Sequence, residues 1–359
     1  MSRLSALNIG FFDSYRVWGG GEKWHDEMSR YLSAQRHDVT VYTPNDGELH
    51  RRLLGKLRLS NASVDKLSYM NPRDQFRYYR KFKRNNLDVL IFNSFIDVRA
   101  AAIAAKKAGV KRTILRIGTP IAPAQKKSYI YTFQNGLDEI VGISKENLDC
   151  FYRDAPELIK DKPTRIIPNA IDIDVFKKIE RPKNEVITFG NCVRLTDQKG
   201  LEDLLQAVYQ IKSLGKKFRV LLAGDGEDRQ KLEAFCEENN LNEVEFLGHV
   251  EDTAEFYNKL DFLVFTSRFE GTARTILESM ACQVPVISYN ASSMKELVID
   301  GENGLLAKAF EVPDLTNKIL HFLNNPDGLE EMGYNGRKMV ESNYNREIIY
   351  KKWSDYLTE

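Results

Sequence analysis

The stretch EVITFGNCVRLTDQKGLEDLLQAVYQIKSLGKKFRVLLAGDG (185–226) predicts a strand, a loop, an amphipathic helix and a second strand in succession. Its two strand segments, EVITFGN (185–191) and FRVLLAGDG (218–226), are nearly continuous apolar runs, which is typical of strands covered on both faces. Between them, LEDLLQAVYQIKSLG (201–215) spaces its apolar residues as one face of a helix does. This unit therefore predicts a parallel sheet flanked by helices.

The same alternation of apolar strands and helices recurs along the whole chain. Further strand runs lie at 6–12, 38–43, 88–93, 112–117, 138–144 and 164–169 in a first series, and at 244–249, 261–267 and 284–289 in the second. Between the two series, PNAIDIDVFKKIERPKNE (168–185) carries Pro168, Pro182 and a charge cluster, which indicates a hinge. We therefore expect an α/β protein of two doubly wound, Rossmann-like domains, with a ligand in the cleft where the carboxyl ends of their strands face each other.

Length and composition agree with two ordinary domains. A chain of 359 residues is too long for one core. No apolar run approaches a membrane span, and the first residues lack a signal peptide, so we expect a cytoplasmic protein. The cysteines and histidines form no ligand pattern, which indicates thiols without a disulfide framework and no metal held by protein side chains. The cysteines are Cys150, Cys192, Cys236 and Cys282.

Charge is distributed unevenly along the chain. Residues 1–180 carry a net charge of +10, whereas residues 181–359 carry −9. The basic excess concentrates in RRLLGKLRLS (51–60) and in RDQFRYYRKFKRNN (73–86), where aromatic residues alternate with arginine and lysine. One interpretation is a helix that packs its aromatic residues inward and exposes its charges. The other is a surface for anionic lipid, at the inner face of the cytoplasmic membrane, or for an acidic acceptor. Nucleic acid is a weaker candidate, because no recognition motif accompanies the charge.

A glycine-rich loop follows the first expected strand. In VWGGGEKW (17–24), Gly19, Gly20 and Gly21 precede Glu22 and open a helix. Glycines let a backbone approach a ligand closely, and a helix N-terminus offers N–H groups to an anion. The spacing differs from the G-x-G-x-x-G of dinucleotide-binding proteins, and no acidic residue follows where one would hold a ribose, so the loop alone does not indicate a dinucleotide site.

Two cations follow the first strand of the second series. Arg194 and Lys199 stand in the loop between that strand and its helix. A guanidinium, an ammonium and the N–H groups of a helix N-terminus together suit a diphosphate. The alternative is a pair of solvated loop charges.

The segment RFEGTARTILESMA (268–281) carries two glutamates with seven residues between them. A helix that begins near Thr272 leaves Glu270 before the helix and Glu278 about two turns along it, roughly 12 Å away at 1.5 Å per residue. This separation exceeds that of a catalytic carboxyl pair in a retaining glycosidase. It suits two glutamates that hold hydroxyl groups at opposite ends of one elongated ligand, with a diphosphate on the N–H groups of Gly271, Thr272 and Ala273.

Five segments, in this order, resemble the family 4 glycosyltransferases, which are retaining nucleotide-sugar enzymes of the two-domain GT-B fold. They are GGGEKWHDEMSRYLSAQRHDVTVYTP (19–44), RIIPNAIDIDVF (165–176), VRLTDQKGLEDLLQA (193–207), LLAGDGEDRQKLE (221–233) and EGTARTILESMACQVPVIS (270–288). Ala170 stands where glycine is usual. The resemblance implies an acceptor-binding domain over 1–169, a nucleotide-sugar-binding domain over 170–342 and a C-terminal helix over 343–359 that returns to the first domain.

The resemblance also implies roles for single residues. Arg194 and Lys199 would neutralise the leaving diphosphate, with support from the amides of Gly271–Ala273. Glu270 would hold the transferred sugar and Glu278 the ribose. Further donor-binding candidates are Gly20, Gly21, Asn191 and, for the base, the backbone near Val250. The implied donor is a nucleoside-diphosphate sugar, UDP favoured over GDP, and the implied reaction retains the anomeric configuration without a metal or other cofactor.

One departure from the family concerns the sugar. Many relatives carry a histidine after the fourth strand of the first domain, where this chain reads LRIGTPIAP (115–123). Arg116, Gly118 and Thr119 are the candidates to replace it, and Glu22 is a further candidate on the sugar or acceptor side. Two other functions stay open on the same fold: a non-catalytic partner subunit that binds nucleotide sugar, and a nucleotide-sugar epimerase. The transferase is favoured because Arg194, Lys199, Glu270 and Glu278 are all present.

Overall fold

The computed structural model describes residues 6–65, 67–180 and 185–359, called the described residues below. The chain divides into two compact units. Unit 1 comprises Met1–Pro168 with Tyr350–Glu359, and unit 2 comprises Asn169–Ile349. The predicted boundaries lie at 169/170 and 342/343, the second of them inside a helix rather than after it. Part of the predicted hinge, residues 181–184 with Pro182, lies outside the described residues.

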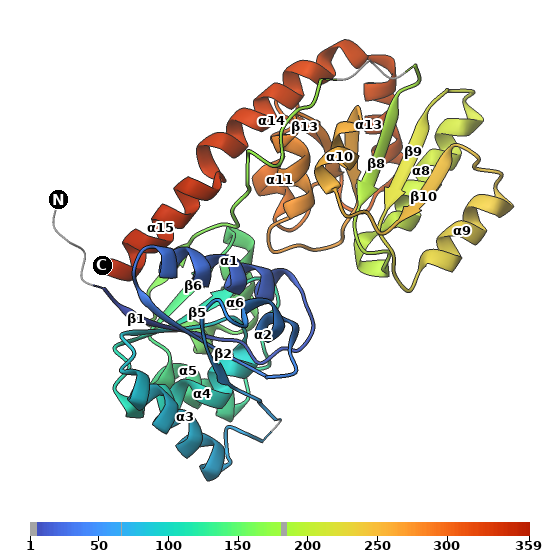
Figure 1. The fold of residues 1–359 in the computed structure, drawn as a ribbon. Helices are drawn as coiled ribbons and strands as arrows, with labels where there is room; N and C mark the ends of the chain where they lie inside the picture. The colour runs from blue at the N-terminus through green and yellow to red at the C-terminus, as the bar shows by residue number, and fades with distance from the viewer. Residues whose placement is uncertain (1–5, 66, 181–184) are drawn as a thin grey trace. The chain divides into compact units, whose positions relative to one another are not determined.

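Unit 1 contains a parallel sheet, which has seven strands in the described residues (Figure 1). Its strand order is β3-β2-β1-β4-β5-β6-β7. The elements of this unit are β1 (Asn8–Phe12), α1 (Gly20–Ala34), β2 (Asp38–Thr43), α2 (Glu48–Leu53), β3 (Arg58–Asn61), α3 (Pro72–Asn85), β4 (Val89–Phe92), α4 (Phe95–Ala108), β5 (Arg112–Ile117), α5 (Lys127–Gly136), β6 (Glu139–Gly142), α6 (Lys145–Asp154), α7 (Pro156–Ile159) and β7 (Thr164–Ile166).

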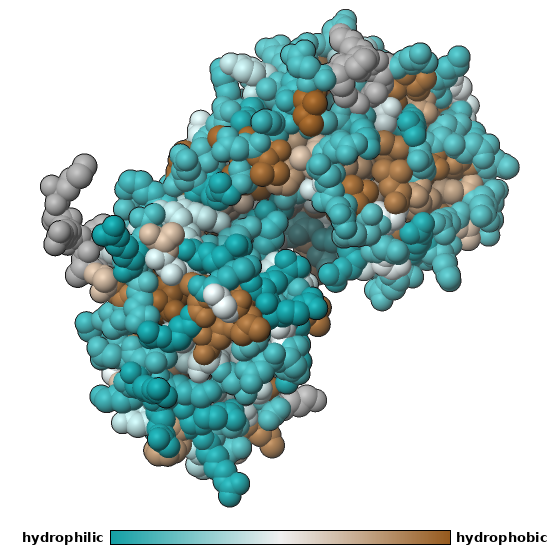
Figure 2. Space-filling model, in the orientation of Figure 1, coloured by the Kyte–Doolittle hydropathy of each residue, from teal (hydrophilic) through white to brown (hydrophobic). Residues whose placement is uncertain are grey.

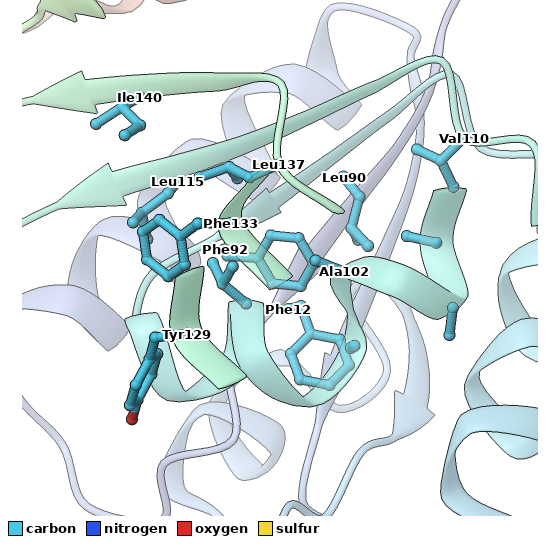
Figure 3. Packing of buried hydrophobic residues seen from close by; sticks show 14 of the residues in the cluster. Phe12, Leu90, Phe92, Ala102, Val110, Leu115, Tyr129, Phe133, Leu137 and Ile140 are labelled. Atoms are coloured by element: carbon cyan, nitrogen blue, oxygen red, sulfur yellow. The ribbon is translucent and has the colours of Figure 1, made fainter. Parts of the chain in front are cut away.

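The main core of unit 1 lies between the sheet and the helices α3, α4 and α5, which pack against one another. Phe12, Leu90 and Phe92 project from the strands into this core, where Phe133 of α5 meets them (Figure 3). Burying such a side chain contributes about 1.5–3 kcal/mol. Helix α4 faces this core with alanines, so α5 approaches it closely: a Cβ on Gly136 would lie 2.8 Å from the Cβ of Ala102. Small residues here replace side-chain interdigitation with direct backbone contact.

Unit 2 contains a second parallel sheet, of six strands over the described residues, in the order β10-β9-β8-β11-β12-β13. Hydrophobic clusters cover both of its faces, as the uninterrupted apolar strand runs predict. Its elements are β8 (Thr188–Cys192), the 3₁₀ turn η1 (Asp197–Lys199), α8 (Leu201–Ser213), β9 (Arg219–Ala223), α9 (Arg229–Glu238), β10 (Val244–Gly248), α10 (Thr253–Asn258), β11 (Phe262–Phe265), α11 (Arg274–Ala281), β12 (Val286–Tyr289), α12 (Met294–Leu297), β13 (Gly304–Ala307), α13 (Val312–Asn324), the 3₁₀ turn η2 (Pro326–Gly328) and α14 (Leu329–Asn343).

The two doubly wound sheets confirm the predicted fold class, but two strands were not predicted. These are β3 and β13, and each forms an edge of its sheet. Both are four residues long, and β3 reads RLSN, with an arginine and a serine where an interior strand has apolar residues. The polar residues of β3 are typical of an edge strand, whereas β13 reads GLLA and is too short to stand out as an apolar run.

The surface of the protein is mostly hydrophilic, with separate hydrophobic patches in the view of Figure 2. No helix within residues 6–65, 67–180 and 185–359 has both the length and the apolar character needed to cross a bilayer. All four cysteines are free; Cys192 is half-buried and the other three are buried.

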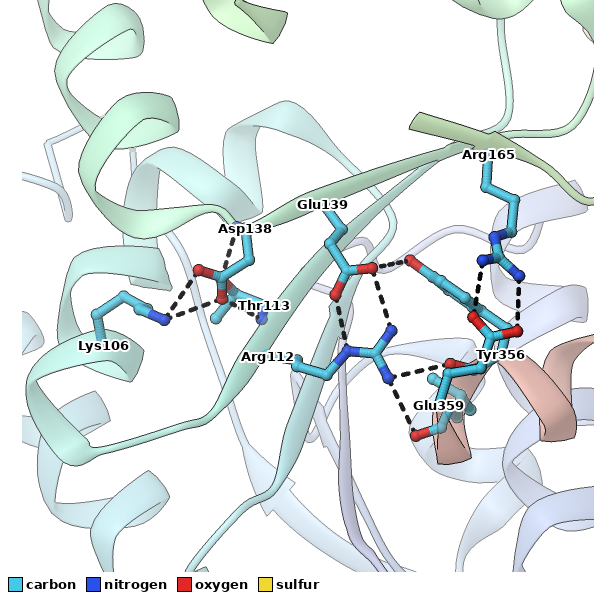
Figure 4. Close-up of polar contacts among 9 residues, drawn as sticks. Lys106, Arg112, Thr113, Asp138, Glu139, Arg165, Tyr356 and Glu359 are labelled. Atoms are coloured by element: carbon cyan, nitrogen blue, oxygen red, sulfur yellow. Dashed lines mark hydrogen bonds and ion pairs between the residues drawn. The ribbon is translucent and has the colours of Figure 1, made fainter. Parts of the chain in front are cut away.

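The C-terminal helix α15 (Arg346–Thr358) ends against the amino ends of the unit 1 strands (Figure 4). The Arg112 guanidinium of β5 donates to the carbonyl oxygens of Tyr356 and Leu357, at 3.0 and 3.1 Å. It also binds both carboxylate oxygens of Glu139, at 2.7 and 3.1 Å, while the Tyr356 hydroxyl donates to the same carboxylate at 2.8 Å. Burial alone would raise the pKa of Glu139, but these hydrogen bonds hold it below its ordinary value. Arg112 therefore caps the free carbonyls at the end of α15.

We expect Arg112→Met to loosen the end of α15. The substitution leaves two helix carbonyls and a largely buried carboxylate without their donor, at a cost of about 2 kcal/mol, or roughly 30-fold in local opening. Hydrogen exchange of the amides in residues 354–358 measures this opening. Arg165→Met is the matched control, because Arg165 and Glu359 pair in an exposed position, with side chains 48% and 53% exposed. Equal exchange in the two variants would contradict the capping role.

Candidate functional site

The strand order of unit 2 reverses between β8 and β11. The chain leaves β8 toward β9 on one side and leaves β11 toward β12 on the other, so the loops that follow these two neighbouring strands diverge. In open α/β sheets this switch point is where ligands bind. Arg194 and Lys199 follow β8, and Glu270 follows β11, so the fold brings the three predicted catalytic residues to one edge of this sheet.

The loop after β8 is fixed by close backbone contacts with the loop after β9. Its amides at Val193 and Leu195 donate to the carbonyls of Ala223 and Asp225, each at 3.0 Å. Gly224, at φ +128°, has no room for a side chain, because a Cβ there would lie 1.9 Å from the Val193 carbonyl oxygen. The backbone is thus held while the Arg194 side chain is exposed, and Arg194 has no ion pair with any described residue.

Lys199 and Glu270 form an ion pair, with Nζ and Oε1 2.6 Å apart and side chains only 19% and 16% exposed. The loops that carry them are joined by further bonds: the Arg268 amide donates to the Gln198 carbonyl at 2.8 Å, and the Thr266 hydroxyl donates to the Lys199 carbonyl at 2.9 Å. Gly200, at φ +62°, lies directly against this second loop. Cation and carboxylate are therefore placed by the backbone of both loops.

Two serines hold Glu270 in place. The Ser267 hydroxyl donates to its Oε1 at 2.8 Å, and the Ser292 hydroxyl, from the loop after β12, donates to its carbonyl oxygen at 2.9 Å. The Glu270 amide donates back to the Ser292 oxygen at 3.2 Å. A carboxylate that accepts from both an ammonium and a hydroxyl has a defined orientation, as a group that binds sugar hydroxyls requires.

Helix α11 begins at Arg274, two residues later than predicted, with Ala273 at its N-cap. Gly271 and Thr272 belong to the preceding turn, and all three residues are buried. Neither α11 nor α8 has a side chain hydrogen-bonded at its N-cap. The ends of both helices at the switch point therefore keep backbone donors that a diphosphate could use.

Glu278 lies in the second turn of α11 and is buried. Its Oε2 accepts from the Tyr257 hydroxyl at 3.1 Å, and its Oε1 lies 3.4 Å from an Arg274 nitrogen. Burial, followed by the charge of Glu278, raises the pKa of Tyr257, so this hydroxyl stays a donor at neutral pH. Sequence reasoning did not single out Tyr257 or Arg274, although Arg274 lies one helical turn before Glu278.

The remaining donor-side candidates of unit 2 lie at strand ends. Asn191 is the penultimate residue of β8 and is 1% exposed, yet both polar atoms of its amide lack a hydrogen-bond partner in the described residues. A buried amide without partners is costly unless a ligand or water satisfies it. Val250 follows β10 and is half-buried against the apolar cluster that includes Leu277.

Unit 1 has its own switch point, between β1 and β4, where three carboxyl groups gather. Asp13 directly follows β1, Asp97 lies in the first turn of α4, and Glu22 in the first turn of α1; all three are buried. Burial, followed by the Asp13 carboxylate, raises the pKa of Glu22 to about 7. The same two causes raise the pKa of Asp97. His25 lies 3.2 Å from Asp13 and faces these carboxyls from α1.

The candidates to replace the family histidine lie at the same edge of this sheet. Arg116, in β5, is 2% exposed; it donates to the Asn93 side chain at 3.0 Å and packs over the Trp24 ring, 4.4 Å from its centre. Its positive charge lowers the pKa of Glu22, against the larger effects of burial and Asp13. Gly118 adjoins Arg116, whereas Thr119 is exposed. Arg116 is thus already engaged by its neighbours.

The glycine loop has the predicted position at the start of α1, with Gly19 at the N-cap. A Cβ on Gly21 would lie 1.9 Å from the Asn93 side-chain nitrogen, whereas a Cβ on Gly20 would meet nothing within 4 Å. Gly21 is therefore needed for packing, and Gly20 borders open space. Asp13 and Asp97 were missed by sequence reasoning, although Asp13 stands at the carboxyl end of an expected strand. The described residues contain no group of three or more histidine, cysteine or acidic side chains able to hold a metal.

The raised pKa of Glu22 predicts a pH dependence of unit 1 stability. Its pKa rises from 4.5 to about 7 on folding, so between these pH values the folded chain binds more protons than the unfolded chain. Stability should therefore fall as pH rises from 4.5 to 7, and Glu22→Gln should make this fall shallower. Asp97 contributes in the same direction.

Tryptophan fluorescence measures this effect, because Trp18, Trp24 and Trp353 all belong to unit 1. The unfolding midpoint is compared at pH 5 and pH 7.5. Glu157→Gln, at an exposed carboxyl of the same unit, is the control. A slope unchanged by Glu22→Gln would show that Glu22 is ionised throughout this range.

Comparison with known proteins identifies the family. The family model for glycosyl transferases group 1 matches residues 172–339, and that for glycosyltransferase family 4 matches residues 18–175. An uncharacterized glycosyltransferase of Methanocaldococcus jannaschii is 40% identical over 143 residues, which span 39% of this chain and 39% of that protein. The chain is therefore aligned with well under half of that relative.

Other relatives align along nearly the whole chain. An α-1,4-N-acetyl-D-galactosaminyltransferase of Campylobacter jejuni is 23% identical over 375 residues, covering 98% of this chain and 99% of its own. The crystal structure of Anabaena HepE in complex with UDP and glucose superposes with a TM-score of 0.81 at 20% identity, covering 98% of this chain and all of that one. The fold is the predicted GT-B fold, and the chain belongs to the group 1 glycosyltransferases of the family 4 type.

Proposed function

We propose that the protein transfers a sugar from a nucleoside-diphosphate sugar, with UDP favoured over GDP, to a glycan or lipid-linked acceptor. The observation that carries this proposal is the Lys199–Glu270 pair at the switch point of unit 2, next to the exposed Arg194. The pair places Lys199, which neutralises a leaving phosphate, beside Glu270, which binds sugar hydroxyls.

The chemistry requires mainly electrostatic stabilisation. When the bond between the anomeric carbon and the diphosphate breaks, negative charge grows on the departing oxygens. Arg194 and Lys199 neutralise that charge, and the backbone donors before α8 and α11 share it. Glu270 accepts hydrogen bonds from the sugar hydroxyls and so orients the anomeric carbon. Because backbone contacts fix the loops that carry these groups, the main rearrangement is the transfer of the Lys199 ammonium from Glu270 to the diphosphate.

The nucleotide is assigned to the same edge of the unit 2 sheet. Glu278, oriented by Tyr257, accepts the ribose hydroxyls, and the backbone near Val250 contacts the base. The orphaned Asn191 amide is a further ligand for the diphosphate or the sugar. UDP is favoured because solved structures of similar fold, HepE with UDP and glucose among them, contain it.

The acceptor and the stereochemistry are inferred from what the relatives are named for. Relatives are named for capsular polysaccharide and amylovoran synthesis, and the C. jejuni enzyme is named for an undecaprenol-PP-linked acceptor and an α-linkage. An α-linked product is what retention gives from an α-linked nucleotide sugar. We infer retention by front-face attack, in which the departing phosphate accepts the acceptor proton, without a metal.

Removing either cation should abolish most of the activity. We expect Lys199→Ala and Arg194→Ala each to lower the rate of UDP-sugar turnover by roughly 10²-fold or more, because each removes charge stabilisation made in the transition state. The rate of UDP release from UDP-glucose and related donors measures this turnover. When no acceptor is present, slow hydrolysis of the donor gives the same readout. Lys216→Ala and Arg219→Ala, exposed cations near the amino end of β9, are the controls.

The outcomes separate the alternatives. Turnover that survives in both site variants would refute the diphosphate site. No turnover in the wild type with any donor would favour a non-catalytic partner subunit, and isomerised nucleotide sugar without an acceptor would identify an epimerase.

A second part of the proposal places α3 of unit 1 against an anionic membrane. Tyr78 and Phe82 of this helix are buried in the core, but Phe76 is 60% exposed, so the aromatic residues divide between the two faces. The helix carries six basic residues, of which four are exposed and form no ion pair with any described residue: Arg73, Arg80, Lys83 and Arg84. A protein held on the bilayer by this helix would lie on the same membrane surface as a lipid-linked acceptor.

We expect the protein to sediment with anionic vesicles at low salt and to be released at high salt. Each basic residue near anionic lipid contributes about 1 kcal/mol, and screening removes this contribution. Replacing Arg73, Arg80 and Lys83 together by glutamate should abolish the binding. The charge-matched control replaces Lys216, Lys217 and Arg219 of unit 2 by glutamate. Equal recovery in the supernatant with anionic and neutral vesicles would refute the membrane contact.

A further inference from the structure

Unit 1 has a pocket of about 540 Å³ that neither the donor site nor the carboxyl edge of the sheet explains. It lies beside the edge strand β3, against the last turns of α3. Its lining residues are Thr40, Arg58, Leu59, Ser60, Lys81, Arg84 and Asn85. Thr40 and Arg58 are paired in the sheet and belong to the amino-terminal halves of their strands. The pocket is therefore distinct from the edge at which Glu22 and Asp13 lie.

The strand sequences explain why the space under α3 is not filled. Side chains alternate along a strand, so Thr40 shares a face with Tyr42, whose ring meets Phe82 of α3 at 5.1 Å. Arg58 and Ser60 pair with Thr40 and Tyr42, so they also belong to the face that α3 covers. Polar and charged residues thus occupy positions where a covered sheet normally has apolar ones. A hollow lined by hydroxyls and cations results.

The charge in this hollow is of one sign. Arg58, Lys81 and Arg84 line it, and no acidic residue does. Asp38 meets Arg58 at 3.1 Å in an exposed pair, which leaves two cations uncompensated. Arg84 is exposed and makes no ion pair within the described residues, and the Lys81 ammonium donates only to the Asn61 carbonyl. Burial, followed by the charge of Arg77, lowers the pKa of Lys81. Like charges gathered in a concavity favour an anion.

We propose that this pocket binds a phosphate ester that carries hydroxyl groups. Arg84 and Lys81 hold the phosphate oxygens, as guanidinium and ammonium groups commonly do. Thr40, Ser60 and the Asn85 side chain, which line the same pocket, hydrogen-bond the hydroxyls. The volume exceeds that of a lone phosphate and lies in the range of small-molecule sites. Such an ester is either the headgroup of an anionic glycerophospholipid or a soluble polyol phosphate, and the pocket recognises the chemistry they share.

Calorimetric titration of the full chain with glycerol phosphate, and with inorganic phosphate for comparison, tests the proposal. The pocket variant is Lys81→Ser with Arg84→Ser. The matched control is Arg73→Ser with Lys83→Ser, which removes the same two residue types from the same helix outside the pocket. We expect saturable binding of glycerol phosphate that weakens at least tenfold in the pocket variant and less than twofold in the control. Because Lys81 is half-buried, Arg84→Ser alone is also measured, with an expected loss of at least threefold.

Two further measurements identify the site and the source. Arg219→Ala, at an exposed cation of unit 2 outside the proposed donor site, should leave glycerol phosphate binding unchanged, and this holds whether or not the chain is a transferase. If free glycerol phosphate releases the protein from phosphatidylglycerol vesicles, the pocket is assigned to a lipid headgroup. Binding of glycerol phosphate without such competition would assign it to a soluble ester. Equal loss in the pocket and control variants, or no saturable binding to the wild type, would overturn the proposal.

Discussion

Burial of parallel strands on both faces is the constraint on which the remaining structure depends. Such strands use most of their side chains for packing and their backbone for the sheet, so polar groups concentrate at and beyond the strand ends. In both sheets the strand order reverses once, between β1 and β4 and between β8 and β11. The polar groups that matter gather there: Lys199 and Glu270 in unit 2, and Asp13 and Glu22 in unit 1.

Backbone contacts, more than side chains, determine the geometry of the donor site. Gly200 and Gly224 leave no room for a side chain, so the loops after β8, β9 and β11 touch each other directly. Hydrogen bonds between backbone amides and carbonyls join these loops, and the Lys199–Glu270 ion pair adds a side-chain contact between two of them. The two charges therefore start in contact. Under the proposed function, a diphosphate that takes up the ammonium would free the carboxylate for sugar hydroxyls. Binding and alignment would thus be coupled in one step.

Unit 1 departs from the expected composition at two places, and both involve charge in positions that packing alone would leave apolar. At the switch point, Asp97 and Glu22 are buried close enough to Asp13 for their pKa values to rise. Beside the edge strand, Arg58 faces α3 and helps to form the basic pocket. Buried charge costs stability, so the buried carboxyls at the switch point indicate function rather than folding. Arg58 is exposed, so this cost does not apply to it.

The sequence alone determined the fold class and predicted most of the candidate site, because both predictions depend on local patterns. Apolar runs of strand length mark the interior strands, and motifs at their carboxyl ends identified Arg194, Lys199, Glu270 and Glu278. The edge strands β3 and β13 were missed because each has only four residues; β3 is also largely polar, whereas β13 is apolar but too short to mark a strand. Only the tertiary structure decided which distant residues meet: Tyr257 with Glu278, Ser292 with Glu270, Arg112 with the end of α15, and Arg58 with Lys81 and Arg84. Such contacts depend on strand order and on how helices pack across a sheet. Patterns of neighbouring residues in the sequence therefore do not predict them.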